Sequence, residues 1–445
     1  MADISIPWGD ETLTASLPAD WTVQQVASPA IPSAQDDWPE RLAAALARPE
    51  GSPPLGKLLA ARSGGRIVVI VEDLTRHSPL PIILEAVFRE FHHANIPDEN
   101  IEIFFATGMH PPLTDEEAAA KIGPGLAGKI NWRCNPWRDR DAYVNLGPVR
   151  AGGATIDLLA DRGVVGADLR IVISSVSPHL QAGFGGGYKM FVPGCAHLET
   201  IRQLHLLSVP RRHSQQVGQP ARLNRMRRLI DAAGNAIDSA GGKSFGVQYI
   251  LDNSDRLSAV AAGDVTVCQR MLAKHCASGC GVILNHLADV VIVNAWPRDF
   301  DLWQAFKAIA NTCWAARDKG VIICLARCPG GVNMPTPSLP ISPKCIRRLV
   351  RLFGADSLAS MMTRMVPTIS GDAAFFVRLA LQILQRNTVM MVSPVLAGAD
   401  EKMPGLPVFS DPAEAFADAD AELGSGPKRV VVFPAGGASY PILRR

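Results

Sequence analysis

The chain has 445 residues, of which 47% are hydrophobic and 19% charged, so two or three folded domains with substantial cores are expected. The 44 Lys and Arg residues nearly balance the 42 Asp and Glu residues, and a formal charge of +2 favours neither disorder through self-repulsion nor binding to nucleic acid. The most basic run, residues 222–228, contains no aromatic residue and is interpreted as a solvated helix face.

No segment reaches the ~20 consecutive apolar residues of a membrane span, and the N-terminal sequence lacks an apolar export signal, so we expect a cytoplasmic protein that does not bind membranes. Nine cysteines, an odd number spread along the chain, favour reduced thiols over a disulfide framework. The C-x-x-x-C pairs, Cys276 with Cys280 and Cys324 with Cys328, could suggest zinc. Structural zinc sites normally use tighter pairs, so buried core cysteines are the preferred interpretation.

Short β-branched runs alternate with helical patterns, which is typical of an α/β fold with mainly parallel sheets covered by helices. The expected strands are residues 66–72, 101–106, 169–174, 247–251, 289–294, 321–326, 389–393 and 429–433. Helical spacing and a capping box predict helices over residues 81–94, from Thr114 onward, over 196–207 and over 266–277.

Two α/β lobes are the simplest architecture for this pattern. The Gly-containing break at residues 278–281 is followed by a new strand–helix series. We therefore expect an N-terminal lobe over residues 1–280 and a C-terminal lobe over residues 281–445.

Polar residues follow three of the predicted strands. Asp73-Leu74-Thr75-Arg76 follows the first strand, His110 follows the second, and His179 follows the third. Because ligands of open α/β sheets bind outside the carboxyl ends of the strands, we expect an Arg and two His at one edge of a sheet.

A glycine-rich segment, residues 178–194 (PHLQAGFGGGYKMFVPG), carries four glycines ahead of Lys189. Tyr188 and Met190 flank this lysine, so the segment is not a phosphate-binding P-loop, and the dinucleotide fingerprint G-x-G-x-x-G is also broken. The segment is interpreted as an open, flexible loop that lets the backbone approach a ligand and delivers one amine to it. A surface turn with a solvated lysine is the alternative.

Two further candidates lie on predicted helices. His205 shares an inward-facing stripe with Leu198 and Ile201, where a core histidine without a function is the alternative. Gln304 and Lys307 lie three residues apart, on one face of a helix that Asp301 is expected to cap, where an exposed polar face is the alternative.

Taken together, these residues make the chain resemble the lactate racemase family, whose members depend on a nickel-pincer nucleotide. The resemblance covers most of the chain from about Leu46. It implies two α/β lobes with the cofactor in an active-site cleft between them. It depends on the joint order and spacing of Asp73-x-Thr75-Arg76, Gly108-x-His110, Pro178-His179, the glycine-rich segment up to Lys189, His205 and Gln304-x2-Lys307.

The resemblance implies that the nickel-pincer nucleotide, a Ni(II) pyridinium bis-thiocarboxylate mononucleotide, is covalently tethered to Lys189 and that His205 is the protein ligand of nickel. Ni(II) favours square-planar coordination, so a tridentate pincer leaves one in-plane position for a neutral imidazole. Small glycines would let the amine and backbone pack against this planar ligand. The remaining cofactor-binding residues implied are Asp73, Leu74, Thr75, Arg76, Gln304 and Lys307, and Arg76 is also a candidate for the substrate carboxylate.

His110 and His179 match the family's catalytic acid/base pair. The α-hydrogen of a 2-hydroxy acid is barely acidic, so its removal as hydride is easier when a base takes the hydroxyl proton. The resulting 2-keto acid is planar and can receive hydride on either face, so a base is wanted for each enantiomer. The resemblance therefore implies an isomerase that racemises or epimerises a small 2-hydroxy acid. Cofactor-biosynthesis proteins and a second copy of the chain are the expected partners.

Three departures leave the substrate open. The family's typical Gly-Gly-Arg-Lys reads Gly187-Tyr188-Lys189, its Thr-Arg-Pro ends in His77, and Trp303 stands where Tyr is familiar. Two other functions are considered: a non-catalytic cofactor-binding or nucleotide-binding protein, and an NAD-dependent dehydrogenase. The broken dinucleotide fingerprint argues against the dehydrogenase.

Overall fold

The computed structural model describes residues 2–34, 36–62, 64–210, 213–333, 342–365, 374–399 and 405–444. The chain forms two compact units. The central unit comprises Ile31–Ser208 and Gln219–Ser278, and the terminal unit comprises Met1–Ala30, Val209–Gly218 and Gly279–Arg445. This division differs from the one expected at residue 280, because the first thirty residues and a short internal segment belong with the C-terminal part.

The central unit is built on a six-stranded sheet whose neighbours are all parallel except β12 and β13. The four strands expected in this part of the chain are confirmed, with small shifts at their ends. In spatial order the strands are β13 (Leu257–Asp264), β12 (Ser244–Leu251), β9 (Leu169–Ser175), β4 (Ile67–Val71), β5 (Ile101–Phe105) and β6 (Asn131–Cys134).

The order of the strands reverses beside β4. From β4 the chain proceeds to β5 and β6 on one side, and it then returns to place β9 and β12 on the other side. In doubly wound sheets the carboxyl ends of the strands at such a reversal bound the ligand crevice. The fold therefore directs attention to the segments that follow β4 and β9.

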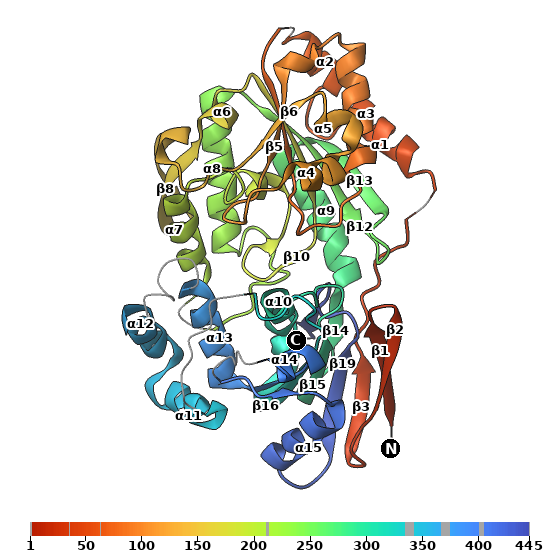
Figure 1. Ribbon diagram of the computed structural model, residues 1–445, viewed down its shortest axis with the longest axis vertical. Helices are drawn as coiled ribbons and strands as arrows, with labels where there is room; N and C mark the ends of the chain where they lie inside the picture. Colours follow the sequence, from red (N-terminus) through yellow and green to blue (C-terminus); the bar gives the residue numbers. More distant parts are fainter. Residues whose placement is uncertain are drawn as a thin grey trace. The chain divides into compact units, whose positions relative to one another are not determined.

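Both faces of this sheet are buried, which explains the continuous apolar run of β4. Ile67, Val69 and Val71 pack on one side of the sheet, and Val68 and Ile70 pack on the other. The first side is covered by α1 (Trp38–Ala47), α2 (Leu55–Ala60), α3 (Leu80–His93) and α4 (Asp115–Ile122). The second side is covered by the hairpin β7 (Tyr143–Ala151) and β8 (Ala154–Asp161) with α7 (Leu198–Ser208) and α8 (Arg225–Gly241) (Figure 1).

The helices that the sequence predicts in this unit begin within one or two residues of the expected positions. Thr114 caps α4 in a complete capping box with Glu117, and α3 starts with a proline in its first turn. The expected helix over residues 266–277 is α9 (Val265–Cys280). Short elements complete this unit: α5 (Pro124–Ala127), α6 (Arg162–Val165), β10 (Pro178–His179), β11 (Gly183–Phe184) and the 3₁₀ turns η1 (Asp98–Asn100), η2 (Arg140–Ala142) and η3 (Gly187–Met190).

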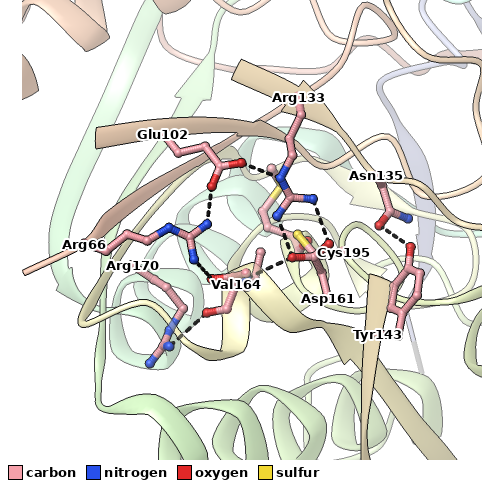
Figure 2. A network of polar contacts seen from close by, with 11 residues as sticks. Arg66, Glu102, Arg133, Asn135, Tyr143, Asp161, Val164, Arg170 and Cys195 are labelled. Atoms are coloured by element: carbon pink, nitrogen blue, oxygen red, sulfur yellow. Dashed lines mark hydrogen bonds and ion pairs between the residues drawn. The ribbon is translucent and has the colours of Figure 1, made fainter. Parts of the chain in front are cut away.

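An ion network ties the β7–β8 hairpin to the sheet (Figure 2). Arg133 on β6 donates to Asp161 at 2.8 and 2.7 Å and also to Glu102 on β5, which pairs in turn with Arg66 ahead of β4. Asp161 also accepts the Val164 amide at 2.9 Å and thereby caps α6. Buried Asp161 and partly buried Glu102 are thus matched by two guanidinium groups, an arrangement that ties together four segments far apart in sequence.

The terminal unit has a second six-stranded sheet, entirely parallel. It contains the four remaining expected strands, together with an N-terminal strand that pairs with β19 and so brings the start of the chain into this unit. The spatial order is β18 (Val408–Phe409), β17 (Thr388–Val392), β16 (Ala316–Leu325), β15 (Ala288–Asn294), β19 (Lys428–Phe433) and β3 (Trp21–Val26).

The other elements of this unit are two small sheets and a set of helices. One sheet pairs β1 (Asp3–Trp8) with β2 (Glu11–Ser16), and the other pairs β14 (Gly281–Leu284) with β20 (Tyr440–Leu443). The helices are α10 (Leu302–Thr312), η4 (Cys313–Ala315), α11 (Pro343–Phe353), α12 (Ala355–Met365), α13 (Ala374–Arg386), α14 (Pro394–Ala397) and α15 (Pro412–Leu423).

In the part of the chain that the structure describes, no helix combines the length and the apolar character that a bilayer crossing requires. All nine cysteines fall within that part, and none of them forms a disulfide.

Candidate active site

The segment after β4 holds a carboxylate that organises its own loop and binds a histidine. One oxygen of Asp73 accepts bonds from the Thr75 amide at 3.0 Å and the Thr75 hydroxyl at 2.5 Å. The other oxygen lies 2.5 Å from Nδ1 of His110, which follows β5. Burial would raise the pKa of Asp73, but the bonds from His110 and Thr75 and the charge of Arg76 lower it well below its usual range. The structure therefore joins two of the predicted site segments through an ionised carboxylate.

Glu72 is a site residue that the sequence analysis missed. This buried carboxylate accepts bonds from the Ser175 amide and hydroxyl at 2.8 and 2.6 Å, from Ser78 at 2.5 Å and from the Tyr249 hydroxyl at 3.0 Å. It links the ends of β4, β9 and β12. A charged residue directly after a fully apolar strand is the signal that could have found it, as it found Asp73.

Buried Asn135, also missed, anchors the His110 loop. Its amide nitrogen donates to the carbonyls of Gly108 and Ala196, both at 3.0 Å, while its oxygen accepts the Tyr143 hydroxyl at 2.7 Å (Figure 2). The Gly108 amide also donates to the Gly194 carbonyl at 3.1 Å. The loop that carries His110 is therefore fixed to the segment between Lys189 and His205.

His179 lies on the small hairpin of β10 and β11, after β9. Its Nδ1 accepts the backbone amides of Gln181 at 3.2 Å and Ala182 at 3.0 Å. The tight turn that follows the histidine thus fixes the ring through its own backbone.

The glycine-rich segment is not the sterically open loop that we expected, because its glycines are buried against protein atoms. A β-carbon on Gly183 would lie 2.3 Å from the Gln219 carbonyl oxygen, one on Gly186 would lie 2.8 Å from the side chain of Val176, and one on Gly187 would lie 2.9 Å from that of Gln269. All three glycines have φ between +65° and +77°, a conformation that other residues rarely adopt. The small residues are therefore required by internal packing, and the expectation that they face a planar ligand is not supported at these positions.

Arg227 corrects the interpretation of residues 222–228 as a solvated helix face. Its guanidinium is fully buried and donates to the carbonyls of Phe184, Gly185 at 3.3 Å and Gly186 at 3.1 Å. The run lies at the start of α8, whose buried side includes Arg227. This residue ties the helix to the backbone immediately before Lys189.

Lys189 and His205 share one electrostatic environment. Burial and the charges of Arg76 and Arg227 lower the pKa of Lys189 to about 7. Burial and the charges of Lys189 and His110 lower the pKa of His205 to about 3. Lys189 and His110 therefore each lie within electrostatic range of His205, and at neutral pH the imidazole of His205 is neutral.

These properties fit the cofactor that the resemblance implies. A metal ligand must be an unprotonated imidazole, and His205 is one at any pH above about 3. A nucleophilic amine must be neutral, and Lys189 is substantially neutral near pH 7. Arg76 contributes a positive charge beside this amine, which suits a cofactor phosphate or a substrate carboxylate. Within the described residues, no three His, Cys, Asp or Glu side chains form a cluster that could hold a metal by themselves.

The other predicted site residues lie at the turn after β4 and on α10. Leu74 is 43% exposed at the turn after β4. Gln304 and Lys307 lie on α10 in the terminal unit, where the Lys307 ammonium donates to the Gln304 side-chain oxygen at 2.7 Å. Asp301 caps this helix through the Gln304 amide at 2.6 Å, as expected.

Two of the departures from the family pattern have a packing explanation. Tyr188 is buried, its hydroxyl donates to Asp238 on α8 at 2.6 Å, and its ring occupies the space left by the absent side chain of Gly234. Trp303 stacks on Phe376 of α13 with ring centroids 3.8 Å apart. The third departure, His77, is exposed and lies 3.3 Å from Asp255.

The chain is similar to known proteins. The family model described as the lactate racemase N-terminal domain matches residues 8–218. The chain is 28% identical over 340 residues to a lactate racemase of Thermoanaerobacterium thermosaccharolyticum, a match that covers 74% of this chain and 76% of that protein. It is 26% identical over 339 residues to a lactate racemase of Lactiplantibacillus plantarum, with 73% and 75% covered.

The fold is also shared. The structure of the lactate racemase apoprotein from Thermoanaerobacterium thermosaccharolyticum superposes with a TM-score of 0.79 at 23% identity, and the match covers 100% of both chains. The expected α/β class with mainly parallel sheets is confirmed. The resemblance stated from the motifs is confirmed as well: the chain is similar to two lactate racemases over 73–74% of its length, its residues 8–218 match the lactate racemase N-terminal domain, and this similarity indicates an isomerase of the racemase type.

Proposed function

We propose that the chain racemises or epimerises a small 2-hydroxy acid by reversible hydride transfer through a 2-keto acid, with a nickel-pincer nucleotide as cofactor. The observation that supports the proposal best is that the charges of Lys189 and His110 both act on buried, neutral His205. Lys189 would hold the cofactor covalently and His205 would ligate its nickel. When bound, the cofactor would accept the α-hydrogen as hydride and return it.

The residues of the chain itself would bind the substrate and handle its proton. Arg76, beside the Asp73–His110 pair, would bind the carboxylate as a planar fork. Asp73 holds the Nδ1 proton of neutral His110, which leaves Nε2 able to accept the hydroxyl proton of the substrate. His110 and His179 would be the groups that meet the 2-hydroxyl oxygen. Asp73, Leu74 and Thr75 would contact the cofactor, and Gln304 and Lys307 on α10 are also proposed as cofactor-binding residues.

The expected setting follows from the proposal. Such an enzyme would work in the cytoplasm, would need cofactor-biosynthesis proteins in the same cell, and is proposed to form a homo-oligomer. Its substrate is a 2-hydroxy acid of the lactate type or a larger analogue, since both curated relatives are named lactate racemase.

The test is expression in a host that makes the cofactor. Purified protein is expected to contain nickel and to carry a mass adduct on the peptide that contains Lys189, and both are expected to disappear in Lys189→Ala. A panel of enantiopure 2-hydroxy acids, followed by chiral chromatography, identifies the substrate. In heavy water the α-hydrogen should be retained, because hydride returns internally. Rapid deuterium incorporation at this carbon would contradict hydride transfer.

A further inference from the structure

The side chain of Arg76 is held by its own loop. Its Nη1 donates to the carbonyl and the hydroxyl of Thr75, at 3.1 and 3.2 Å, and this hydroxyl donates in turn to Asp73. The Nε and Nη2 atoms of Arg76 make no hydrogen bond or ion pair with the residues that the structure describes. The Nε–Nη2 edge of the guanidinium, with two parallel N–H groups, is therefore available to a planar carboxylate.

The backbone of Arg76 is held by a different element. Lys121, in the last turn of α4, is only 9% exposed, and its ammonium donates to the carbonyl oxygen of Arg76. The two residues are 45 positions apart in sequence, so this contact ties a helix that covers the sheet to the loop after β4. The next residue, His77, contributes little to holding the loop, because its 3.3 Å pair with Asp255 is exposed to water.

The hydrogen bond of this buried ammonium is not explained by charge neutralisation. Burial lowers the pKa of Lys121, and the charges of Glu72 and Asp73 oppose this effect. Glu72, however, already accepts four hydrogen bonds from neutral donors. Among the described residues, the acceptor of the Lys121 ammonium is the Arg76 carbonyl and neither of these carboxylates. A lysine that served only to balance charge would pair with a carboxylate directly.

We propose that Lys121 is a positioning residue: by holding the Arg76 carbonyl, it orients the Nε–Nη2 edge of the guanidinium toward the carboxylate of the 2-hydroxy acid. This inference rests on the proposed function for the identity of the anion. The carboxylate keeps its charge in both the hydroxy acid and the keto acid, so Arg76 binds substrate and intermediate alike. Loss of this orientation should therefore raise KM and leave kcat nearly unchanged.

Lys121→Met tests the hydrogen bond, because it removes the donor and keeps an apolar stem of similar length. In cofactor-loaded enzyme we expect KM for lactate, or for the 2-hydroxy acid found in the chiral panel, to rise about ten- to hundredfold, the range of a lost hydrogen bond to a charged group. The exposed Lys129→Met is the matched control and should change neither KM nor kcat. A KM within about twofold of that of the unmodified enzyme, or a loss confined to kcat, would overturn the inference.

A double variant shows whether Lys121 acts through Arg76. Arg76→Met should raise KM by itself, and the addition of Lys121→Met should then have little further effect, because the group to be oriented is already absent. If Lys121 supports the site independently of Arg76, the two substitutions multiply their effects on KM. That result would also overturn the inference.

A further measurement does not need activity. Hydrogen exchange of apoprotein, read by mass spectrometry, follows the loop after β4, where the amides of Thr75 and Arg76 are hydrogen-bonded. In Lys121→Met, peptides that cover this loop should exchange faster, while peptides of the β7–β8 hairpin should not change. Unchanged exchange in the loop, or faster exchange throughout the central unit, would contradict a specific hold on Arg76.

The two measurements separate the inference from the proposed function. If the unmodified enzyme racemises no 2-hydroxy acid but the loop exchanges faster in Lys121→Met, the proposed function fails and the hold of Lys121 on the loop stands. If racemisation is found and KM does not rise in Lys121→Met, the inference fails and the proposed function stands.

Discussion

Replacing Asn135 tests whether one buried amide holds the His110 loop against the segment that leads to His205. In Asn135→Ala, the carbonyls of Gly108 and Ala196 and the hydroxyl of Tyr143 all lose a partner. Each buried polar group left unsatisfied costs about 1–3 kcal/mol, and at the lower end of that range the three together cost about 3 kcal/mol. A loss of this size raises the population of the locally opened state about a hundredfold.

Hydrogen exchange read by mass spectrometry is the suitable assay, because a chain of two units does not unfold in a single transition. Peptides that cover Gly108 and Ala196 should exchange faster in Asn135→Ala, while peptides of the terminal unit should not change. The control is Asn145→Ala, since the exposed Asn145 accepts only a local bond from the Gly147 amide at 2.8 Å.

The isosteric variant Asn135→Asp sharpens the test. It keeps the acceptor for the Tyr143 hydroxyl but sets an oxygen against two carbonyl oxygens, so it should be destabilised at least as much as the alanine variant. Protection in Asn135→Asp equal to that of the unmodified protein would refute the reasoning, because shape alone would then account for the role of the residue.

Three further predictions concern the site. Labelling of Lys189 in apoprotein by an amine-reactive reagent should reach half its maximum near pH 7, well below the ordinary lysine pKa of about 10.4. Between these two pH values the folded chain binds fewer protons than the unfolded chain, so Lys189 makes the free energy of unfolding rise with pH. If the free energy of unfolding, compared with that of Lys189→Met, stays flat or falls across this range, the shift is contradicted. Arg227→Met should reduce the free energy of unfolding of the central unit by about 3–5 kcal/mol and so lower its thermal midpoint. Substitution of the exposed neighbour, Arg228→Met, should change that midpoint by no more than about a degree or two, and calorimetry of both variants tests this. Asp73→Asn should lower racemisation at least about a hundredfold with little change in the thermal midpoint, and activity near that of the unmodified enzyme would show that its histidine partner does not depend on the carboxylate.

The sequence was informative wherever a local pattern decides the structure. β4 is an unbroken apolar run, Thr114 and Asp301 have the side chains that cap helices, and Asp73 and His110 stand shortly after the ends of two predicted strands. These features depend on neighbours within a few positions, so single-sequence reasoning predicts the elements and the strand-end residues Asp73 and His110.

What the sequence did not predict depends on distant partners. The place of Glu72 after an apolar strand marks it as a candidate, but its hydrogen-bond donors come from three separate segments that its local sequence does not identify. Arg227 stands in a basic run that resembles a solvated face, although Ile230 and Gly234 at positions i+3 and i+7 belong to the same buried side of the helix. The pairing of β3 with β19 joins segments from opposite ends of the chain. Such long-range contacts depend on tertiary packing and cannot be predicted from local sequence.

The pairing of β3 with β19 also has a consequence for synthesis of the chain. The edge strand Trp21–Val26 emerges from the ribosome early, but its only sheet neighbour, Lys428–Phe433, is translated near the end. The strands of the central unit, in contrast, have all been synthesised once Asp264 is translated. That unit can therefore fold before the partner of the N-terminal strand has been synthesised. A gene split at the codon for residue 280 would therefore part this strand from its sheet, whereas a circular permutation that moves residues 1–30 behind the present C-terminus would keep the two strands together.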